Sequence, residues 1–271
     1  MAKTKTVKKS TDIEDSNKVN WIGLYSFIRR EVERIFLVVI QTVVSPLISA
    51  FLFIFIFGFI LGQRIELIAG IPYMKFVFPG ILMMNILTSS FMHSSNSLYF
   101  ARFMHTINEI LTAPFSYIEM IIGFVVGAVI RGLIVGVGVL IIGLLFGAVT
   151  IAHPILFFLY VVGIAVIFAL LGLVVGLWAK GFEQLNILNT FVIMPLSFLG
   201  GMFYSIEFLS DTIRTITLYN PFFYFVDAMR FSTIGYNESN LLVGGVIMVG
   251  LIVFLAVLVV HLFKTGWRLR E

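Results

Sequence analysis

One short segment gathers polar residues of several chemical types between two long apolar stretches. It reads YFARFMHTINEILTAPFSYIEM, and four polar side chains fall within eight residues: Arg102, His105, Asn108 and Glu109. A helix over about 94–113 would carry most of them off its apolar stripe. Pro114 would end that helix, because proline lacks the N–H that a helix interior needs. The segment is therefore predicted to be a short amphipathic helix that a protein partner could push on.

The rest of the sequence lacks the residue patterns that catalysis needs. It contains no cysteine, and its four histidines are scattered, so neither a disulfide framework nor a metal cluster is expected. It has no GK[ST] phosphate cradle and no GxSxG nucleophile elbow. We predict that the chain is not an enzyme and holds no cofactor or metal itself. Any ATP, with its Mg, would be bound by a separate ATPase subunit.

Arg131 is the one charged residue deep within an apolar stretch. An unpaired arginine there costs about 2.5–3.5 kcal/mol on insertion scales. Glu119 lies twelve residues away, or about 18 Å along a helix, so the two cannot pair within that helix. Two interpretations remain open. Arg131 is either a structural arginine bonded to backbone carbonyls, or part of a substrate pathway that attracts phosphate or sugar-acid groups.

Membrane-spanning helices are the elements that would position these residues. Of the 271 residues, 60% are hydrophobic and 12% are charged, about half the ~25% of a typical soluble domain. Six apolar runs exceed the ~17 residues that a spanning helix needs, and no alternating barrel strands occur. The predicted fold is an all-α integral membrane protein with one six-helix domain over 35–265. The expected spans are Ile35–Leu61, Phe76–Leu98, Glu119–Val149, Ile155–Trp178, Leu185–Phe203 and Leu241–Phe263.

The basic residues predict the orientation. If the N-terminus is cytoplasmic, thirteen lysines and arginines fall on the inner side and four on the outer side. The positive-inside rule then places both termini in the cytoplasm, at the inner membrane. Residues 1–19 are expected to form a disordered cytoplasmic tail and residues 266–271 a short second tail.

The segment 20–34 is predicted to be an amphipathic helix in the membrane interface. Its apolar residues share one stripe: Trp21, Tyr25, Ile28, Val32 and Ile35. Its charged residues fill the opposite face: Arg29, Arg30, Glu31, Glu33 and Arg34. The helix is either a plain surface anchor or a docking surface for a cytosolic partner.

Two further patterns bear on packing and on the outer loop. Glycine pairs four residues apart recur along the spans, which fits packing within one bundle or a seam between two copies. The segment 205–235 contains too much charge for a lipid-exposed span, and Asn220-Pro221 marks a break within it. Backbone that enters the membrane without crossing is tolerated only where protein or water covers it.

Two of these segments resemble the membrane component of ABC type-2 exporters. ARFMHTINEILTAPFS is similar to the family's pattern …R…EELLxAPxS, and LYNPFFYFVDAMR is similar to LNPxxYxVDAxR. The resemblance covers about residues 20–265. It implies that 20–34 is an interface helix and that 94–113 is a coupling helix on the ATPase. It also implies two re-entrant outer helices carrying four motif residues: Asn220, Pro221, Asp227 and Arg230.

The sequence thus predicts an export permease. Two copies of the chain with two ATPase subunits would move an amphipathic substrate, such as a lipid-linked glycan, a lipid or a drug. The expected ATPase contacts are Arg29, Arg30, Arg102, His105, Asn108 and Glu109. Membrane lipid is an expected partner. Nucleic acid is not, because the basic residues form no groove-sized patch. The alternatives are an ion-coupled secondary transporter or channel, which the scarcity of acidic residues in the spans disfavours, and an intramembrane enzyme.

Overall fold

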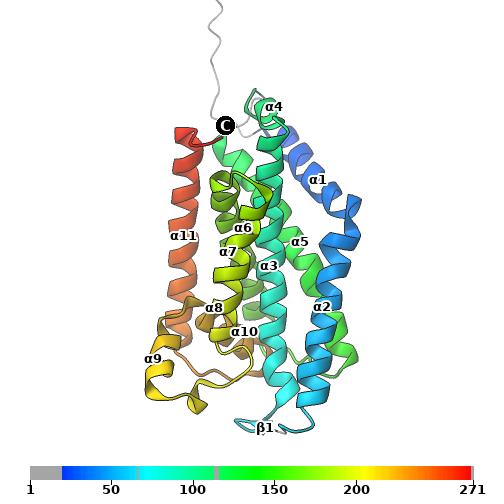
Figure 1. Ribbon diagram of the computed structural model, residues 1–271, viewed down its shortest axis with the longest axis vertical. Helices are drawn as coiled ribbons and strands as arrows, with labels where there is room; N and C mark the ends of the chain where they lie inside the picture. The colour runs from blue at the N-terminus through cyan, green and yellow to red at the C-terminus, as the bar shows by residue number, and fades with distance from the viewer. Residues whose placement is uncertain (1–19, 66, 113–115, 270–271) are drawn as a thin grey trace, which may run out of the picture.

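The computed structural model describes residues 20–65, 67–112 and 116–269, and long helices running along one common direction dominate it (Figure 1). Six helical segments are long and apolar enough to cross a membrane, which confirms the predicted all-α, six-span fold. Their bounds are Ile40–Leu61, Tyr73–Phe103, Tyr117–Leu145, Pro154–Trp178, Phe182–Leu199 and Leu241–Thr265. The predicted tail 1–19 and Pro114 lie outside the described residues.

The core is built around helix α3 (Tyr73–Phe103), which is mostly buried. Helices α5 (Tyr117–Leu145) and α6 (Pro154–Trp178) pack along it (Figure 1). Close approach depends on glycine, since a Cβ added at Gly172 of α6 would lie 2.1 Å from the Ser94 hydroxyl oxygen of α3. Small residues at such contacts let helix backbones approach closely in lipid. The glycine pairs of α5 and α6 therefore serve packing within this chain.

The first span is not one continuous α-helix. Helix α1 (Trp21–Leu37) is followed by a π-helical segment η1 (Ile40–Val44), by α2 (Ser45–Phe53) and by a second π-helical segment η2 (Ile54–Leu61). At the junction, the Thr42 hydroxyl donates to the carbonyl oxygens of Ile35 and Val38 at 2.8 and 3.0 Å. This contact joins the end of α1 to the span that follows it.

The fifth span is interrupted in the same way. It consists of α7 (Phe182–Leu188), the π-helical segment η3 (Asn189–Ile193) and α8 (Met194–Leu199). Single π-helical turns inside α-helices occur frequently at functional sites. Both interrupted spans lie at the edge of the bundle, and little of either is buried by the rest of the chain.

The connections after the first and the fifth span fold into short elements. A hairpin of β1 (Leu67–Ile68) and β2 (Ile71–Pro72) follows the first span. After the fifth span come the 3₁₀ turn η4 (Ile206–Phe208), α9 (Asp211–Tyr219) and α10 (Pro221–Ile234), and the chain then forms α11 (Leu241–Thr265). These short elements lie at the end of the bundle where β1 is labelled (Figure 1).

The predicted single helix over 94–113 is wrong. Residues 94–103 are the last turns of α3, and a separate helix, α4 (Ile107–Thr112), follows a turn. The break falls at His105, whose φ of 56° lies in the left-handed region that does not continue a right-handed helix. The Thr106 hydroxyl donates to the Ala101 carbonyl at 3.3 Å across this turn. The polar segment therefore comprises the end of the long buried helix α3, a turn and the short helix α4.

Helix α1, helix α4 and the last turns of α11 lie at the same end of the bundle (Figure 1). The Asn20 N–H donates to Glu119 Oε1 at 2.7 Å, which holds the start of α1 at the start of α5. Arg268 near the C-terminus donates to the Trp178 carbonyl at 2.7 Å, at the end of α6. These contacts tie the start of α1 and residue 268 to the bundle at this end.

Candidate functional site

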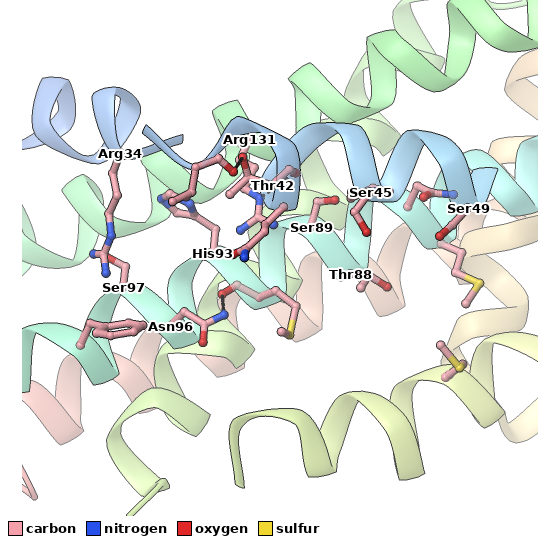
Figure 2. Close-up of a pocket in the computed structure, with 18 of the residues that line it drawn as sticks. Arg34, Thr42, Ser45, Ser49, Thr88, Ser89, His93, Asn96, Ser97 and Arg131 are labelled. Atoms are coloured by element: carbon pink, nitrogen blue, oxygen red, sulfur yellow. Dashed lines mark hydrogen bonds between the residues drawn. The ribbon is translucent and has the colours of Figure 1, made fainter. Parts of the chain in front are cut away.

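A cavity of about 540 Å³ lies between the first span, α3 and the fifth span (Figure 2). Hydroxyl and amide groups line much of it: Gln41, Ser45, Ser49, Asn85, Thr88 and Asn96. Apolar side chains complete the wall: Phe53, Met84, Met92, Phe100 and Met194. Its size is that of sites for drug-sized ligands, which are ~300–1,000 Å³.

Arg131 of α5 reaches this cavity. Its Nε donates to the Thr42 carbonyl oxygen at 3.4 Å, at the long end of the hydrogen-bond range. No salt bridge joins Arg131 to a carboxylate among the described residues. The contact with the carbonyl fits the structural interpretation of Arg131. Its place in a polar cavity fits the interpretation that it belongs to a substrate pathway.

A buried polar cluster adjoins the cavity and joins α1 to α3. Ser97 donates its hydroxyl proton to Glu31 Oε2, and His93 Nε2 lies 3.4 Å from the same oxygen. Arg34 Nη1 donates to the Ser97 oxygen at 3.0 Å. Burial raises the pKa of the Glu31 carboxyl, but hydrogen bonds with His93 and Ser97 outweigh it, so this pKa lies below its usual value. The cluster therefore holds Glu31 as a buried carboxylate.

The predicted faces of α1 are partly wrong. Glu31 is 1% exposed rather than on a solvated face with the other charged residues. The buried positions are Leu24, Phe27, Glu31 and Ile35. This face packs on α5, where a Cβ added at Gly123 would lie 2.0 Å from the Phe27 ring. These buried positions recur every three to four residues, which is the spacing of one helix face and could have predicted this face from the sequence. The charge of Glu31 obscured the pattern.

Arg29 and Arg30 remain at the surface of α1. Arg29 pairs with Glu33 at 2.7 Å, one helical turn along the same exposed face. Arg30 lies with its guanidinium carbon 4.9 Å from the Phe27 ring centroid. The exposed Arg29–Glu33 pair contributes ~0.2–1 kcal/mol at most, so stability does not require it. Arg30 Nη2 also lies 3.7 Å from Oε1 of the buried Glu31. Both arginine side chains are exposed.

Arg102 does not project toward a partner, which corrects the expectation from the sequence. It is buried, and its Nη1 donates to the carbonyl oxygens of Gly176, Leu177 and Ala179 at 2.7, 2.9 and 3.3 Å. These carbonyls end α6, where a positive charge also complements the helix dipole. Arg102 thus fastens the end of α6 to the end of α3.

The other residues predicted for the partner surface lie around the start of α4. His105, Asn108 and Glu109 are exposed at the end of the bundle where α1 begins. The first turn of α4 buries Ile107, which is 1% exposed, against the bundle. The polar residues therefore stand on an anchored helix.

The outer motif forms a buried clamp. Arg230 Nη2 donates to the Gly201 carbonyl at 2.8 Å, and its guanidinium carbon lies 3.8 Å from the Phe76 ring centroid. Glu238 Oε2 lies 3.8 Å from Arg230 Nη1, and both side chains are buried. The sequence did not reveal Glu238 or Gly201 as partners, because loops far apart in the chain bring them together.

Asp227 and Asn220 order the backbone around that clamp. Asp227 accepts from the backbone N–H groups of Glu238 and Ser239 at 2.8 and 2.9 Å. Burial raises the pKa of the Asp227 carboxyl, against the opposing effect of these hydrogen bonds. Asn220 caps α10 by accepting from the Phe222 N–H at 3.0 Å, and Pro221 takes the first helical position. All four motif residues therefore shape the loop.

Comparison with known proteins agrees with this architecture. The family described as ABC-2 type transporter matches residues 23–234. Three similar proteins are each named inner membrane transport permease YadH and come from Escherichia coli strain K12, Escherichia coli O157:H7 and Shigella flexneri. Each is 34% identical over 251 residues, which cover 93% of this chain and 98% of the relative. With its six spans, the chain is therefore a multi-pass inner-membrane transport permease that belongs to the ABC-2 type transporter family.

Proposed function

We propose that this chain is the permease subunit of an ATP-driven exporter. Two copies would form the pathway, and two separate ATPase subunits would bind ATP and Mg. The substrate would be an amphipathic molecule such as a lipid-linked glycan, a lipid or a drug. The observation that carries the proposal is the polar cavity between two weakly buried, π-interrupted spans.

The position of the cavity supports a homodimeric pathway. Met194 of the fifth span and Ser49 of the first span both line it, and these spans are mostly exposed along their lengths. Large exposed apolar side chains occur on both, including Ile48 and Phe191 at 56% and 74% exposed. A second copy packed on this side would cover the spans and enclose the cavity. Membrane lipid would cover the remaining apolar surface.

The end that carries α1 and α4 supports the docking of an ATPase. Arg29 and Arg30 on α1 and Asn108 and Glu109 on α4 are exposed at the same end of the bundle. Force on α4 would act on α3, which the turn at His105 joins to it, and α3 lines the cavity. Force on α1 would act through Glu31 on the same helix. On this proposal, both termini and α4 face the cytoplasm.

One observation supports the alternative of ion coupling. Glu31 and His93 form a buried acid–imidazole contact beside the cavity, which the sequence did not lead us to expect. Buried ionisable groups of this kind occur in proton relays. The export proposal assigns them instead to the joint between α1 and α3, because Ser97 and Arg34 also hold the carboxylate there.

The test uses the full chain, co-expressed with a candidate ABC ATPase subunit and reconstituted in proteoliposomes. The proposal expects the complex to contain two copies of each chain by native mass spectrometry. It also expects flux of a fluorescent amphipath that stops when the catalytic glutamate of the ATPase is replaced. The matched control is the permease alone. Flux by the permease alone, driven by a proton gradient without ATP, would establish the alternative and overturn the exporter.

A further inference from the structure

We propose that the cavity binds the headgroup of a singly charged anionic amphipath, with Arg131 contacting the anion. This inference rests on the proposed function, because it specifies the substrate class of the same pathway. It assigns the phosphate or carboxylate of the ligand to Arg131, its polar headgroup to the hydroxyl-lined wall and its hydrocarbon chain to the membrane-facing side.

The charge balance of the cavity supports an anion. Two arginines line it, Arg34 and Arg131, and no aspartate or glutamate does among the described residues. Glu31 lies behind the wall and is held by Ser97, whose oxygen in turn accepts from Arg34. Glu31 Oε1 also lies 3.7 Å from Nη2 of Arg30, which is exposed and does not line the cavity, so within the cavity wall the negative charge of Glu31 offsets Arg34. Arg131 remains as one positive charge facing the cavity.

The bonding of Arg131 leaves room for a ligand. Its single hydrogen bond within the described part of the chain is the 3.4 Å contact of Nε with the Thr42 carbonyl. A guanidinium can present two parallel N–H groups to a phosphate or carboxylate, which a lone carbonyl does not use. Thr42 belongs to η1, so a π-helical segment fixes the position of that carbonyl.

The remaining wall matches a polar headgroup joined to an apolar chain. Figure 2 shows Ser45 and Ser49 of α2 and Thr88 and Ser89 of α3 along the cavity, beyond Arg131 and Thr42. Hydroxyl groups can donate to and accept from the hydroxyls of a sugar or glycerol headgroup. The volume of about 540 Å³ holds a drug-sized group, so a headgroup fits and a long polysaccharide does not.

The absence of cysteine in the sequence permits a direct binding assay. Ser49→Cys places one reporter thiol in the exposed part of the cavity wall. The variant is purified in phosphatidylcholine nanodiscs, and its rate of reaction with N-ethylmaleimide is measured. Three competitors are compared: lysophosphatidylglycerol, which is anionic, lysophosphatidylcholine, which has no net charge, and glycerophosphoglycerol, which has the same singly charged headgroup without a chain.

The proposal expects lysophosphatidylglycerol to slow the labelling and the other two compounds to have little effect. Adding Arg131→Gln should raise the concentration needed for half-protection about tenfold or more, since bonds to charged groups are the stronger ones. Arg131→Lys should retain part of the protection. Arg214→Gln, which removes an exposed arginine of α9, is the matched control and should leave protection unchanged.

Three outcomes would overturn the inference. Equal protection by the uncharged lipid would show that the cavity does not select for an anion. Protection by glycerophosphoglycerol alone would identify a site for a free anion. Unchanged protection in a folded Arg131→Gln variant, with a size-exclusion profile like that of the parent, would remove Arg131 from the site. The assay contains neither ATP nor an ATPase, so its failure leaves the exporter proposal intact.

Discussion

At the scale of single residues, three buried or partly buried arginines serve three different purposes. Arg102 ends α6, Arg230 clamps the outer loop, and Arg131 faces the cavity. The first two bind carbonyls that loops and helix ends leave without partners. Inside a membrane such carbonyls have no bulk water as a hydrogen-bond partner, so leaving them unpaired would cost free energy. The two arginines supply the missing hydrogen bonds.

Removing the outer clamp is expected to destabilise the protein. Arg230→Gln would leave Glu238 and Asp227 without their buried cation and would lose the contact with Phe76. Breaking a buried pair by removing one partner costs ~3–5 kcal/mol. Thermal unfolding in detergent, followed by size-exclusion chromatography, should show a clearly lower midpoint. Arg214→Gln on exposed α9 should match the wild type, and equal midpoints for both variants would contradict the clamp.

Arg102 and Asn108 should separate structure from docking. Arg102→Gln should lower stability by about 1–3 kcal/mol, because it leaves buried carbonyls of α6 unsatisfied.

Asn108→Arg, on the exposed side of α4, should leave the unfolding midpoint unchanged but reduce ATPase stimulation in the assembled complex. Both quantities are measured on both variants. A stable Arg102→Gln protein would contradict the role assigned to this arginine, and full stimulation by Asn108→Arg would remove α4 from the docking surface.

At the scale of elements, close helix contacts hold α3, α5 and α6 together. Buried apolar side chains gain little from leaving lipid, so association depends on packing and on hydrogen bonds between helices. Glycines of α5 and α6 meet serines of α3, such as Gly132 at Ser90 and Gly172 at Ser94. The peripheral α11 also contains glycines, but Gly245 and Gly250 have nothing within 4 Å of an added Cβ.

These two glycine environments predict opposite responses to alanine. Gly172→Ala should cost about 1–3 kcal/mol, because the new methyl group would meet the Phe91 carbonyl oxygen at 2.5 Å as well as Ser94. Gly250→Ala should be neutral or slightly stabilising, since alanine favours a helix by up to ~1 kcal/mol over glycine. Unfolding midpoints of the two variants provide the comparison. A tolerated Gly172→Ala would show that α3 and α6 are farther apart than described.

At the scale of the whole molecule, the two ends of the bundle differ in chemistry. One end gathers α1, α4 and the last turns of α11, and the other carries the hairpin and α9 (Figure 1). Among the described residues, the order of spans assigns seven lysines and arginines to the first side and four to the second. The positive-inside rule therefore predicts that α4 faces the cytoplasm.

Cysteine labelling tests this orientation. In the cysteine-free chain, Asn108→Cys on α4 and Arg214→Cys on α9 each add one exposed thiol, at opposite ends. In intact spheroplasts, a membrane-impermeant maleimide should modify position 214 and should reach position 108 only after lysis. Labelling of position 108 from outside would reverse the topology, and an ATPase in the cytoplasm could then not contact α4.

The sequence alone determined the six spans, the amphipathic segment before them and the break at Asn220-Pro221. These features depend on local properties: apolar runs long enough to cross the membrane, helical spacing, and the backbone limits of proline. Arg131 was also identifiable, because a single charge in an apolar run stands out. The sequence of α3 did not reveal where its helix would end, since that depends on a turn at His105.

Only the tertiary structure decided which polar groups meet. Glu31 became a buried partner of Ser97 because Gly127 of α5 leaves space for α1 at that position. Arg102 turned inward because the end of α6, more than seventy residues away, offers it three carbonyls. The cavity likewise exists only where the first span, α3 and the fifth span come together. Hydropathy shows which segments can leave water. The partners of each side chain depend instead on how its helix is rotated and which helices it contacts. Residues distant in the chain determine both.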